Sequence, residues 1–218
     1  IITKYTAVLI SCCFLYSSCS DVDDFLDRSP AGGLSEAQVF NSYRQTEQFL
    51  AGIYGRLPSG WLPTENAANT IFTYAAASDE AICSVEWADG PHVFTKGMVN
   101  ATYNPLDNRS AMYQGIRAVH LFLDKIDGLP TNTPTQEAGK RRMKGEAYGL
   151  RAWFYMELFK RYGGVPIVDK VLGINDDLNL PRNTVEETVN FIVESCDLAT
   201  ELLGVSYMAT DMGRLTKG

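Results

Sequence analysis

Apolar residues recur every three or four positions between residues 143 and 162. They are Met143, Ala147, Leu150, Phe154, Leu158 and Tyr162. An α-helix completes a turn about every 3.6 residues, so this spacing places all of them on one face and predicts an amphipathic helix with that face buried. Its start is marked by Thr133 as the N-cap, Pro134 at the first position and Gln136 as the other half of a capping box. We therefore predict one long helix from Pro134 to Tyr162.

The predicted central helix ends abruptly. Gly163 and Gly164 follow its last apolar residue, and either glycine can adopt the left-handed conformation that closes a helix. Pro166 favours an extended conformation at Val165, so no helix continues past this point. The sequence predicts that the helix passes directly into an extended Val-Pro-Ile-Val segment.

A second helical pattern covers residues 35–57. Its start carries Ser35 and Gln38 as a capping box, and its apolar positions are Val39, Phe40, Tyr43, Leu50, Ile53, Tyr54 and Leu57. The pattern fits either one helix or two helices that break near Arg44. Gly52 and Gly55 would weaken the helix, so we expect them where a neighbouring helix approaches closely.

Two more helices follow from the same spacing. One is capped by Ser110 and carries Met112, Ile116, Val119, Leu123 and Ile126 on one face. The other starts at Thr184, boxed by Glu187, and carries Val185, Val189, Ile192, Cys196, Ala199 and Leu203. Because Cys196 falls on this apolar face, we expect a free thiol in the core. Helices joined by short turns pack as antiparallel pairs, so the periodicity permits an all-α fold.

Residues 59–108 lack this periodicity. Aromatic residues are scattered there among Pro, Gly, Asn and Asp, and only the stretch 71–77 suggests a short helix or strand. A long irregular segment within a compact domain is more often functional than idle. We expect this segment to carry the binding chemistry.

Sugars stack their C–H faces on aromatic rings and hydrogen-bond through their hydroxyl groups to polar side chains. The irregular segment offers both kinds of group, and the candidate ligand-binding residues are Trp61, Asp79, Glu80, Trp87, Tyr103 and Asn104. Trp87 stands in a polar, turn-like setting and is the favoured stacking platform. The alternative is that its ring packs under the loop as a local hydrophobic plug. The aromatic run Trp153, Phe154 and Tyr155 lies on the central helix, and we expect it in the core.

Catalysis, metal binding and nucleic-acid binding find little support in the sequence. The chain has a formal net charge of −7, and its densest basic run, Lys140 to Arg142, fits a solvated helix face. His92 and His120 have no metal-ligand partner at helical spacing, and no nucleotide-binding or nucleophile motif is present. We expect no catalytic residues, no metal and no cofactor.

The N-terminus has the order of a secretory signal. Lys4 is followed by a short apolar run and then by the small residues Ser17 and Ser18 before Cys19. Small residues leading into a cysteine resemble the lipobox of bacterial lipoproteins, in which that cysteine is lipidated. We expect residues 1–18 to be the signal peptide and Cys19 the lipidation site. The alternative is an ordinary signal peptide with an incidental cysteine.

The run LRAWFYMELFKRYGGVPIV, residues 150–168, resembles the most characteristic segment of the SusD/RagB-like outer-membrane lipoproteins. The Phe-Leu-Asp at residues 25–27 and Ser78-Asp79-Glu80 are also similar to that family. The chain departs from its pattern at His120, where the family usually has Asn. The final Thr-Lys-Gly, residues 216–218, resembles the opening of a further helix.

This resemblance implies a TPR-like array of antiparallel helix pairs with a long irregular loop region, C-terminally truncated here. Residues 19–34 would be the lipidated N-terminus and tether, and 35–218 the N-terminal helical domain. It further implies a lipid-anchored, surface-exposed outer-membrane protein that binds glycans or other nutrients. The expected partner is a SusC-like TonB-dependent transporter, with no nucleic acid. The alternative function is a helical scaffold lipoprotein that binds a protein partner and no sugar.

Overall fold

The computed structural model describes residues 34–57, 74–82, 84, 89–100, 102–104, 107–208 and 211–217. Residues Ala37–Gly218 form one compact unit, and the description below concerns that unit. The predictions for residues 1–33, including the signal peptide and the lipidation of Cys19, concern residues outside the described part of the chain. The candidate residues Trp61 and Trp87 also lie outside it.

The described residues are helical, with one isolated β-bridge between Asn100 and Tyr103 and no strand. The elements are α3 (Glu36–Phe40), α4 (Tyr43–Tyr54), the 3-10 helix η1 (Tyr74–Ala77), α5 (Asp89–Thr95), α6 (Arg109–Ile126), α7 (Pro134–Tyr162) and α8 (Val185–Leu202). The predicted all-α class is therefore confirmed. The two-helix alternative for residues 35–57 is also correct, with the break at Asn41 and Ser42, next to the predicted position.

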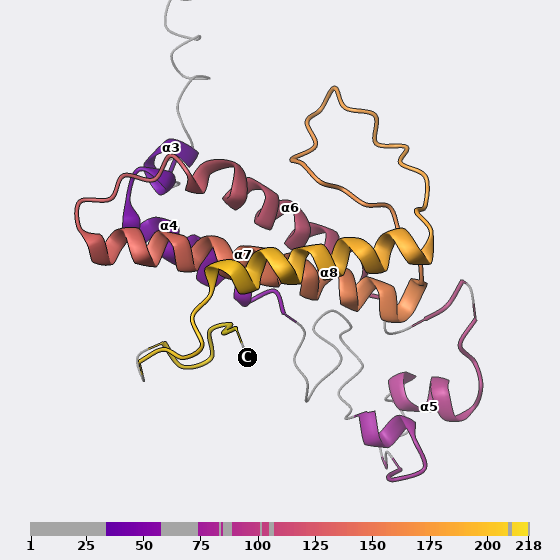
Figure 1. Cartoon of the computed structure of the whole chain (residues 1–218). Coiled ribbons are helices and arrows are strands. Elements are labelled where there is room, and N and C mark those ends of the chain that lie inside the picture. Colours follow the sequence, from indigo (N-terminus) through magenta and orange to yellow (C-terminus); the bar gives the residue numbers. More distant parts are fainter. Residues whose placement is uncertain are drawn as a thin grey trace, which may run out of the picture. The chain divides into compact units, whose positions relative to one another are not determined.

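α7 is the helix on which the others pack. It contacts α4, α6 and α8, and α4 also contacts α6. Figure 1 shows α6, α7 and α8 running in alternating directions, so successive helices form antiparallel pairs as predicted. A short turn joins α6 to α7, whereas the extended segment 163–184 joins α7 to α8.

The ends of α7 follow the sequence signals. The hydroxyl oxygen of Thr133 accepts a hydrogen bond from the Gln136 N–H at 3.2 Å, and Pro134 opens the helix. The Gln136 side chain caps the N–H of Asn132 at 2.8 Å, one residue earlier than a capping box would require. At the other end Gly163 has φ of 68°, the left-handed conformation that favours glycine. The predicted bounds of α7 are confirmed at both ends.

The predicted stripe of α7 forms the centre of the core. Leu150 and Phe154 are fully buried, as are Met143, Ala147 and Leu158. Phe154 packs against Gly115 of α6 so closely that a Cβ at residue 115 would lie 2.6 Å from its ring. Gly115 therefore makes room for the aromatic ring, and any larger residue there would force α6 and α7 apart.

The close approaches were predicted at the wrong glycines. A Cβ at Gly52 would meet no atom within 4 Å, and one at Gly55 would meet only the preceding backbone of α4. The tight contacts lie instead at Gly115 on α6, at Gly139, Gly145 and Gly149 on α7, and at Gly164 just after it. A glycine on a helix shows where the backbone is bare, but the packing of the neighbours decides whether that surface is used.

The predicted buried face of α8 is correct at Ile192, Ala199 and Leu203 but wrong at its other three positions. Cys196 is exposed rather than in the core, and Val185 and Val189 are exposed too. The buried face carries Thr188, Ile192, Ser195 and Ala199. The hydroxyl groups of Thr188 and Ser195 accept hydrogen bonds from the Val165 N–H and from Arg151. This face must satisfy polar groups of the neighbouring segments, so hydrophobicity alone does not mark it.

The remaining differences from the predictions concern the start of α6, two short helices and the exposure of Trp153. α6 begins at Arg109 after Asn108, two residues before the position that a Ser110 cap implies. Within the segment predicted to be irregular, residues 89–95 form α5, which was not predicted, and residues 74–77 form η1, inside the stretch 71–77 that suggested a short helix or strand. Trp153 was expected in the core but is 46 % exposed, whereas Phe154 and Tyr155 are buried as expected.

Replacing Phe154 with alanine is expected to lower the free energy of unfolding by about 3–5 kcal/mol, because the ring is fully buried and its removal leaves a cavity beside Gly115. Trp153→Ala is the matched control: it removes an adjacent aromatic ring that is half exposed, so it should cost clearly less. Chemical denaturation measures both. Equal losses in the two variants would contradict the placement of the buried stripe.

Candidate ligand-binding site

Asp79 and Glu80 lie on an exposed turn directly after η1. The Ser78 hydroxyl donates to the Ala75 carbonyl oxygen at 2.8 Å and accepts from the Glu80 N–H at 3.2 Å. These bonds fix the turn and leave the side chains of both acids in solvent. η1 packs against α5, so the acidic turn belongs to a small substructure made by these two short helices.

Tyr103 belongs to a separate tight turn that follows α5. The side-chain oxygen of Asn100 accepts from the N–H groups of Thr102 and Tyr103 at 2.9 and 3.0 Å. Backbone hydrogen bonds between Asn100 and Tyr103 close the turn. The Tyr103 side chain is 44 % exposed, so its ring is available for stacking. Asn104, the next residue, is partly buried.

A polar cavity of about 510 Å³ lies where the irregular segment leaves α4 and enters α6. Its walls come from the last turn of α4 and the first turns of α6, and are lined by Gly55, Arg56, Asp107, Asn108, Ser110, Ala111 and Gln114. None of these residues was predicted from the sequence to bind a ligand. The signal that could have found them is the polar pair Asp107-Asn108 immediately before a helix, at the end of a long irregular segment.

Asp107 is fixed at the rim of this polar cavity. One of its carboxylate oxygens accepts a hydrogen bond from the Tyr162 hydroxyl, at the end of α7, and another from the Arg109 N–H at 3.1 Å. The Tyr162 hydrogen bond, followed by the Arg109 N–H, lowers the pKa of Asp107. Burial, and then the Asp107 carboxylate, raises the pKa of Tyr162. The rim therefore presents an ionised carboxylate and a neutral phenol at neutral pH.

Among the described residues, the other polar groups of the cavity make few hydrogen bonds that would compete with a ligand. Arg56 donates a long hydrogen bond of 3.4 Å to the Gln114 side-chain oxygen, which leaves other N–H groups of both residues open. The side-chain oxygen of Asn108 is buried, and no donor among the described residues reaches it. Charged, amide and hydroxyl groups arranged in this way match the alternating donors and acceptors of a sugar.

A second surface depression differs from the polar cavity because its lining is mostly apolar. An apolar groove of about 420 Å³ lies between α7 and α8, and its lining residues include Gly149, Ala152, Trp153, Met156, Ile192, Cys196 and Leu215. Trp153 and Met156 are 46 and 44 % exposed there. The groove offers few hydrogen-bonding groups, so it suits an apolar surface better than a sugar.

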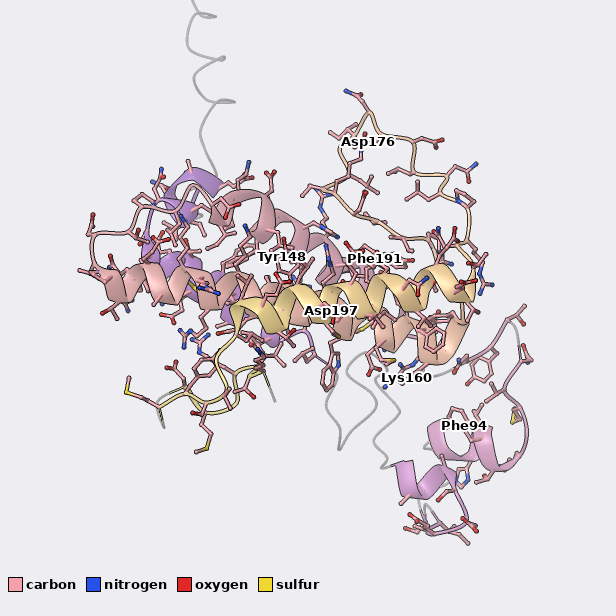
Figure 2. All side chains as sticks on the ribbon, viewed as in Figure 1. Phe94, Tyr148, Lys160, Asp176, Phe191 and Asp197 are labelled. Atoms are coloured by element: carbon pink, nitrogen blue, oxygen red, sulfur yellow. The ribbon has the colours of Figure 1, made fainter. Side chains whose placement is uncertain are left out.

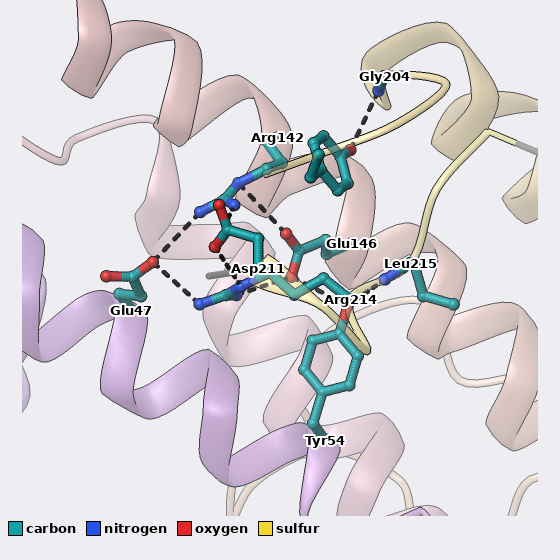
Figure 3. A network of polar contacts seen from close by, with 9 residues as sticks. Glu47, Tyr54, Arg142, Glu146, Gly204, Asp211, Arg214 and Leu215 are labelled. Carbon is teal, nitrogen blue, oxygen red and sulfur yellow. Dashed lines mark hydrogen bonds and ion pairs between the residues drawn. The ribbon is translucent and has the colours of Figure 1, made fainter. Parts of the chain in front are cut away.

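A network of charges ties the C-terminal segment to the bundle (Figure 3). Arg142 of α7 and Arg214 share three acids, Glu47 of α4, Glu146 of α7 and Asp211, at distances of 2.9–3.4 Å. The network joins three segments that are far apart in the sequence. It fixes the end of α4, and the polar cavity begins with the next residues of the chain.

Glu146 lies at the centre of this network and is fully buried. Burial raises its pKa, although Arg214, the Tyr54 hydroxyl and Arg142 oppose the shift. The Tyr54 hydroxyl donates to Glu146 at 2.9 Å and accepts from the Leu215 N–H at 3.1 Å. Tyr54, the last residue of α4, therefore links the buried carboxylate to the backbone of the C-terminal segment.

The described part of the chain offers neither a metal site nor a membrane-spanning helix. No group of three or more His, Cys, Asp or Glu residues there could hold a metal ion. Burial, and then the charge of Arg151, lowers the pKa of His120, so this core histidine is neutral. No helix among the described residues is long and apolar enough to cross a bilayer.

The sequence as a whole identifies the family. A profile of the SusD-like family, described as starch-binding and associating with the outer membrane, matches residues 24–217. This match covers nearly the whole chain, so the protein belongs to the SusD-like family. The family is one of carbohydrate-binding proteins and not of enzymes.

Curated relatives agree with this assignment. The SusD-like protein P38 of Formosa agariphila is 24% identical over 195 residues, which are 87% of this chain and 35% of the relative. A SusD-like protein of Bacteroides ovatus is 23% identical over 209 residues, 96% of this chain and 36% of the relative. The chain thus spans about a third of the length of the relatives that it matches.

Solved structures support the fold. A SusD-like protein of Bacteroides fragilis is 29% identical with a TM-score of 0.65, over 87% of this chain and 35% of that one. A laminarin-binding SusD-like protein is 20% identical with a TM-score of 0.66, over 80% and 37%. The predicted TPR-like helical arrangement is therefore confirmed.

Replacing Arg214 with methionine is expected to lower the free energy of unfolding by about 2 kcal/mol, less than the loss of a sole partner because Arg142 still faces Glu146. The difference in free energy of unfolding between wild type and Arg214→Met should become smaller as the pH falls from about 8 to about 5. The pKa of Glu146 is already raised in the fold and rises further without Arg214, and a group with a raised pKa stabilises the fold as pH falls.

Denaturant titrations at both pH values measure this effect. Lys170→Met is the control, because it breaks an exposed ion pair with Asp176 and should change stability little. A difference that widens toward acid would mean that Glu146 is not the group that depends on Arg214.

Proposed function

We propose that this protein captures glycans at the outer membrane and passes them to a SusC-like TonB-dependent transporter. The observation that carries the proposal is the polar cavity at the two ends of the irregular segment. The helices α4 and α6 hold the residues on both sides of that segment, and its sequence is rich in aromatic residues. Membership of a carbohydrate-binding family supports the same ligand class.

The ligand would lie between the polar cavity and the aromatic residues of the loop. Arg56, Asn108 and Gln114 supply hydrogen bonds to hydroxyl groups from the cavity. Trp61, Trp87 and Tyr103 remain the candidate stacking platforms, with Asp79, Glu80 and Asn104 as further polar partners. Of these, Tyr103 has the exposed ring that stacking requires.

Attachment to the membrane is proposed to depend on Cys19. The cysteine follows the small residues of a signal-like segment, and lipidation there would place the helical domain at the membrane surface. The family's association with the outer membrane supports this arrangement.

A helical scaffold that binds a protein partner is the second candidate. The apolar groove between α7 and α8 favours it, because exposed Trp and Met side chains are typical of protein interfaces. A glycan array probed with the purified chain separates the two functions. Binding of defined oligosaccharides supports the first, and no binding across a broad array contradicts it for this chain.

Trp87→Ala is expected to weaken glycan binding by about 1–3 kcal/mol, by analogy with stacking of bases on aromatic rings, while the melting temperature stays nearly unchanged. Trp153→Ala, which removes an exposed ring outside the irregular segment, is the control and should leave affinity intact. Isothermal titration calorimetry and thermal melts measure the two quantities. Unchanged affinity together with lost stability would mean that Trp87 is a hydrophobic plug.

Cys19→Ser is expected to move the protein from the outer membrane to a soluble fraction, because a serine carries no acyl chains. Fractionation of cells that lack the transporter partner measures this, so that the partner cannot retain the variant. Cys196→Ser is the control, since that exposed thiol is remote in sequence from the signal-like segment and should not affect the distribution. A membrane-bound Cys19→Ser protein would exclude lipidation at this residue.

A further inference from the structure

Among the described residues, one buried charge has no oppositely charged partner. Three charged residues are buried there, Glu146, Arg151 and Glu157, and all are on α7. Glu146 pairs with Arg142 and Arg214, and Glu157 pairs with Lys160 and Arg161. Arg151 is 8 % exposed. No carboxylate oxygen of the described residues lies within 4.0 Å of its guanidinium nitrogens, which is the limit for an ion pair. Its Nη atoms are not among the fully buried polar atoms that lack a partner, so the charged edge of the guanidinium reaches the surface.

The surroundings of Arg151 fix its guanidinium in one orientation. The guanidinium carbon lies 4.9 Å from the ring centre of Tyr148 and 4.7 Å from that of Phe191. In Figure 2 these two aromatic residues lie on the same side of α8. The Arg151 Nε–H donates to the Ser195 hydroxyl at 3.0 Å, and that hydroxyl donates to the Phe191 carbonyl oxygen at 2.7 Å. The guanidinium thus contacts two aromatic rings, and its Nε–H is hydrogen-bonded to Ser195. The edge formed by its Nη groups makes no hydrogen bond to a described residue.

Nearby groups do not neutralise this charge. Asp169 and Glu194 are exposed and lie beyond ion-pair distance. Burial lowers the pKa of Arg151, and the acids and tyrosines around it only partly oppose that shift. His120 is neutral, and its Nε2 is buried with no donor among the described residues. A group that accepts hydrogen bonds and carries negative charge is what this position lacks.

We propose that the Nη edge of Arg151 is a binding site for a small oxyanion, with a carboxylate group as the preferred ligand. Guanidinium and carboxylate are both planar and can form two parallel N–H to oxygen hydrogen bonds. The site is separate from the polar cavity of α4 and α6, and it stands whether or not that cavity binds glycans. Since only 8 % of Arg151 is exposed, the ligand is a small anion or the terminal carboxylate of a larger molecule such as a uronic acid.

Nuclear magnetic resonance of the purified chain tests the proposal on the side chain itself. The Arg151 Nε–H is hydrogen-bonded and buried, so it should exchange slowly and give a resolved signal, identified by its absence in Arg151→Lys. Titration with sodium acetate, against sodium chloride at equal ionic strength, should shift this signal saturably with a dissociation constant on the order of millimolar. Galacturonate is titrated in parallel.

The two titrations distinguish the source of the carboxylate. Equal dissociation constants would identify a free anion as the ligand, and tighter binding of galacturonate would identify the carboxylate of a sugar. No saturable shift with either compound would overturn the proposal. This measurement uses the unchanged protein, so it decides the question even if variants of Arg151 fold poorly.

Arg151→Lys adds a test of the paired hydrogen bonds. Lysine keeps the charge but cannot form the two parallel hydrogen bonds, so its affinity for acetate should be at least about tenfold lower. The rise in melting temperature with acetate concentration measures this affinity. Arg141→Lys is the matched control, because Arg141 lies on the exposed face of the same helix and its substitution should leave acetate binding unchanged. Equal acetate binding by wild type and Arg151→Lys would overturn the assignment of the site to Arg151.

Discussion

The close packing of α7 against its neighbours is the constraint on which the rest of the described fold depends. α6 can lie against α7 because Gly115 leaves space for the Phe154 ring. α8 can lie against it because a Cβ at Gly145 would come within 2.9 Å of Leu202. These contacts bring backbones close together at bare positions, so dispersion forces act over short distances along much of the helix. The apolar stripe supplies the burial, and the glycines determine how closely the neighbours approach.

Close packing on several sides also buries charges on α7, and the chain compensates them in different ways. Burial opposes ionisation of Glu157, but the hydrogen bonds from Lys160 and Arg161 outweigh it and lower the pKa. Both partners are on the same helix, so this charge is compensated locally. Glu146 requires Arg214 from the C-terminal segment as well as Arg142, so its compensation depends on the tertiary fold. Burial of one carboxylate therefore orders residues that are distant in the sequence.

Helix ends and the central stripe could be predicted from the sequence because their causes are local. Thr133 and Gly163 act through hydrogen bonds and backbone conformations within a few residues of themselves. The face of α8 was predicted only in part, because Ser195 is buried where it accepts a hydrogen bond from Arg151, 44 residues away in the sequence. The exposure of Trp153 likewise depends on which sides of α7 the neighbouring helices cover. Periodicity identifies a helix, but long-range polar partners select its buried face.

The polar cavity was missed for the same reason. Its chemistry depends on pairs such as Arg56 with Gln114 and Asp107 with Tyr162, which are separated by more than 50 residues. The sequence did identify residues 59–108 as irregular, because their aromatic residues lack helical spacing. The irregular loop and its base therefore leave different signals. Composition reveals the loop, whereas the fold alone reveals the residues at its base.

Under the proposed function, the position of this cavity would allow one scaffold to serve different ligands. The end of α4 is fixed by Tyr54 and the charge network, and the start of α6 is fixed through Asp107 to the end of α7. Both ends of the loop are therefore held by elements whose stability comes from the core. Because the residues on both sides of the loop are held by the core, we propose that the ligand preference can vary with the loop sequence while the helical fold remains constant.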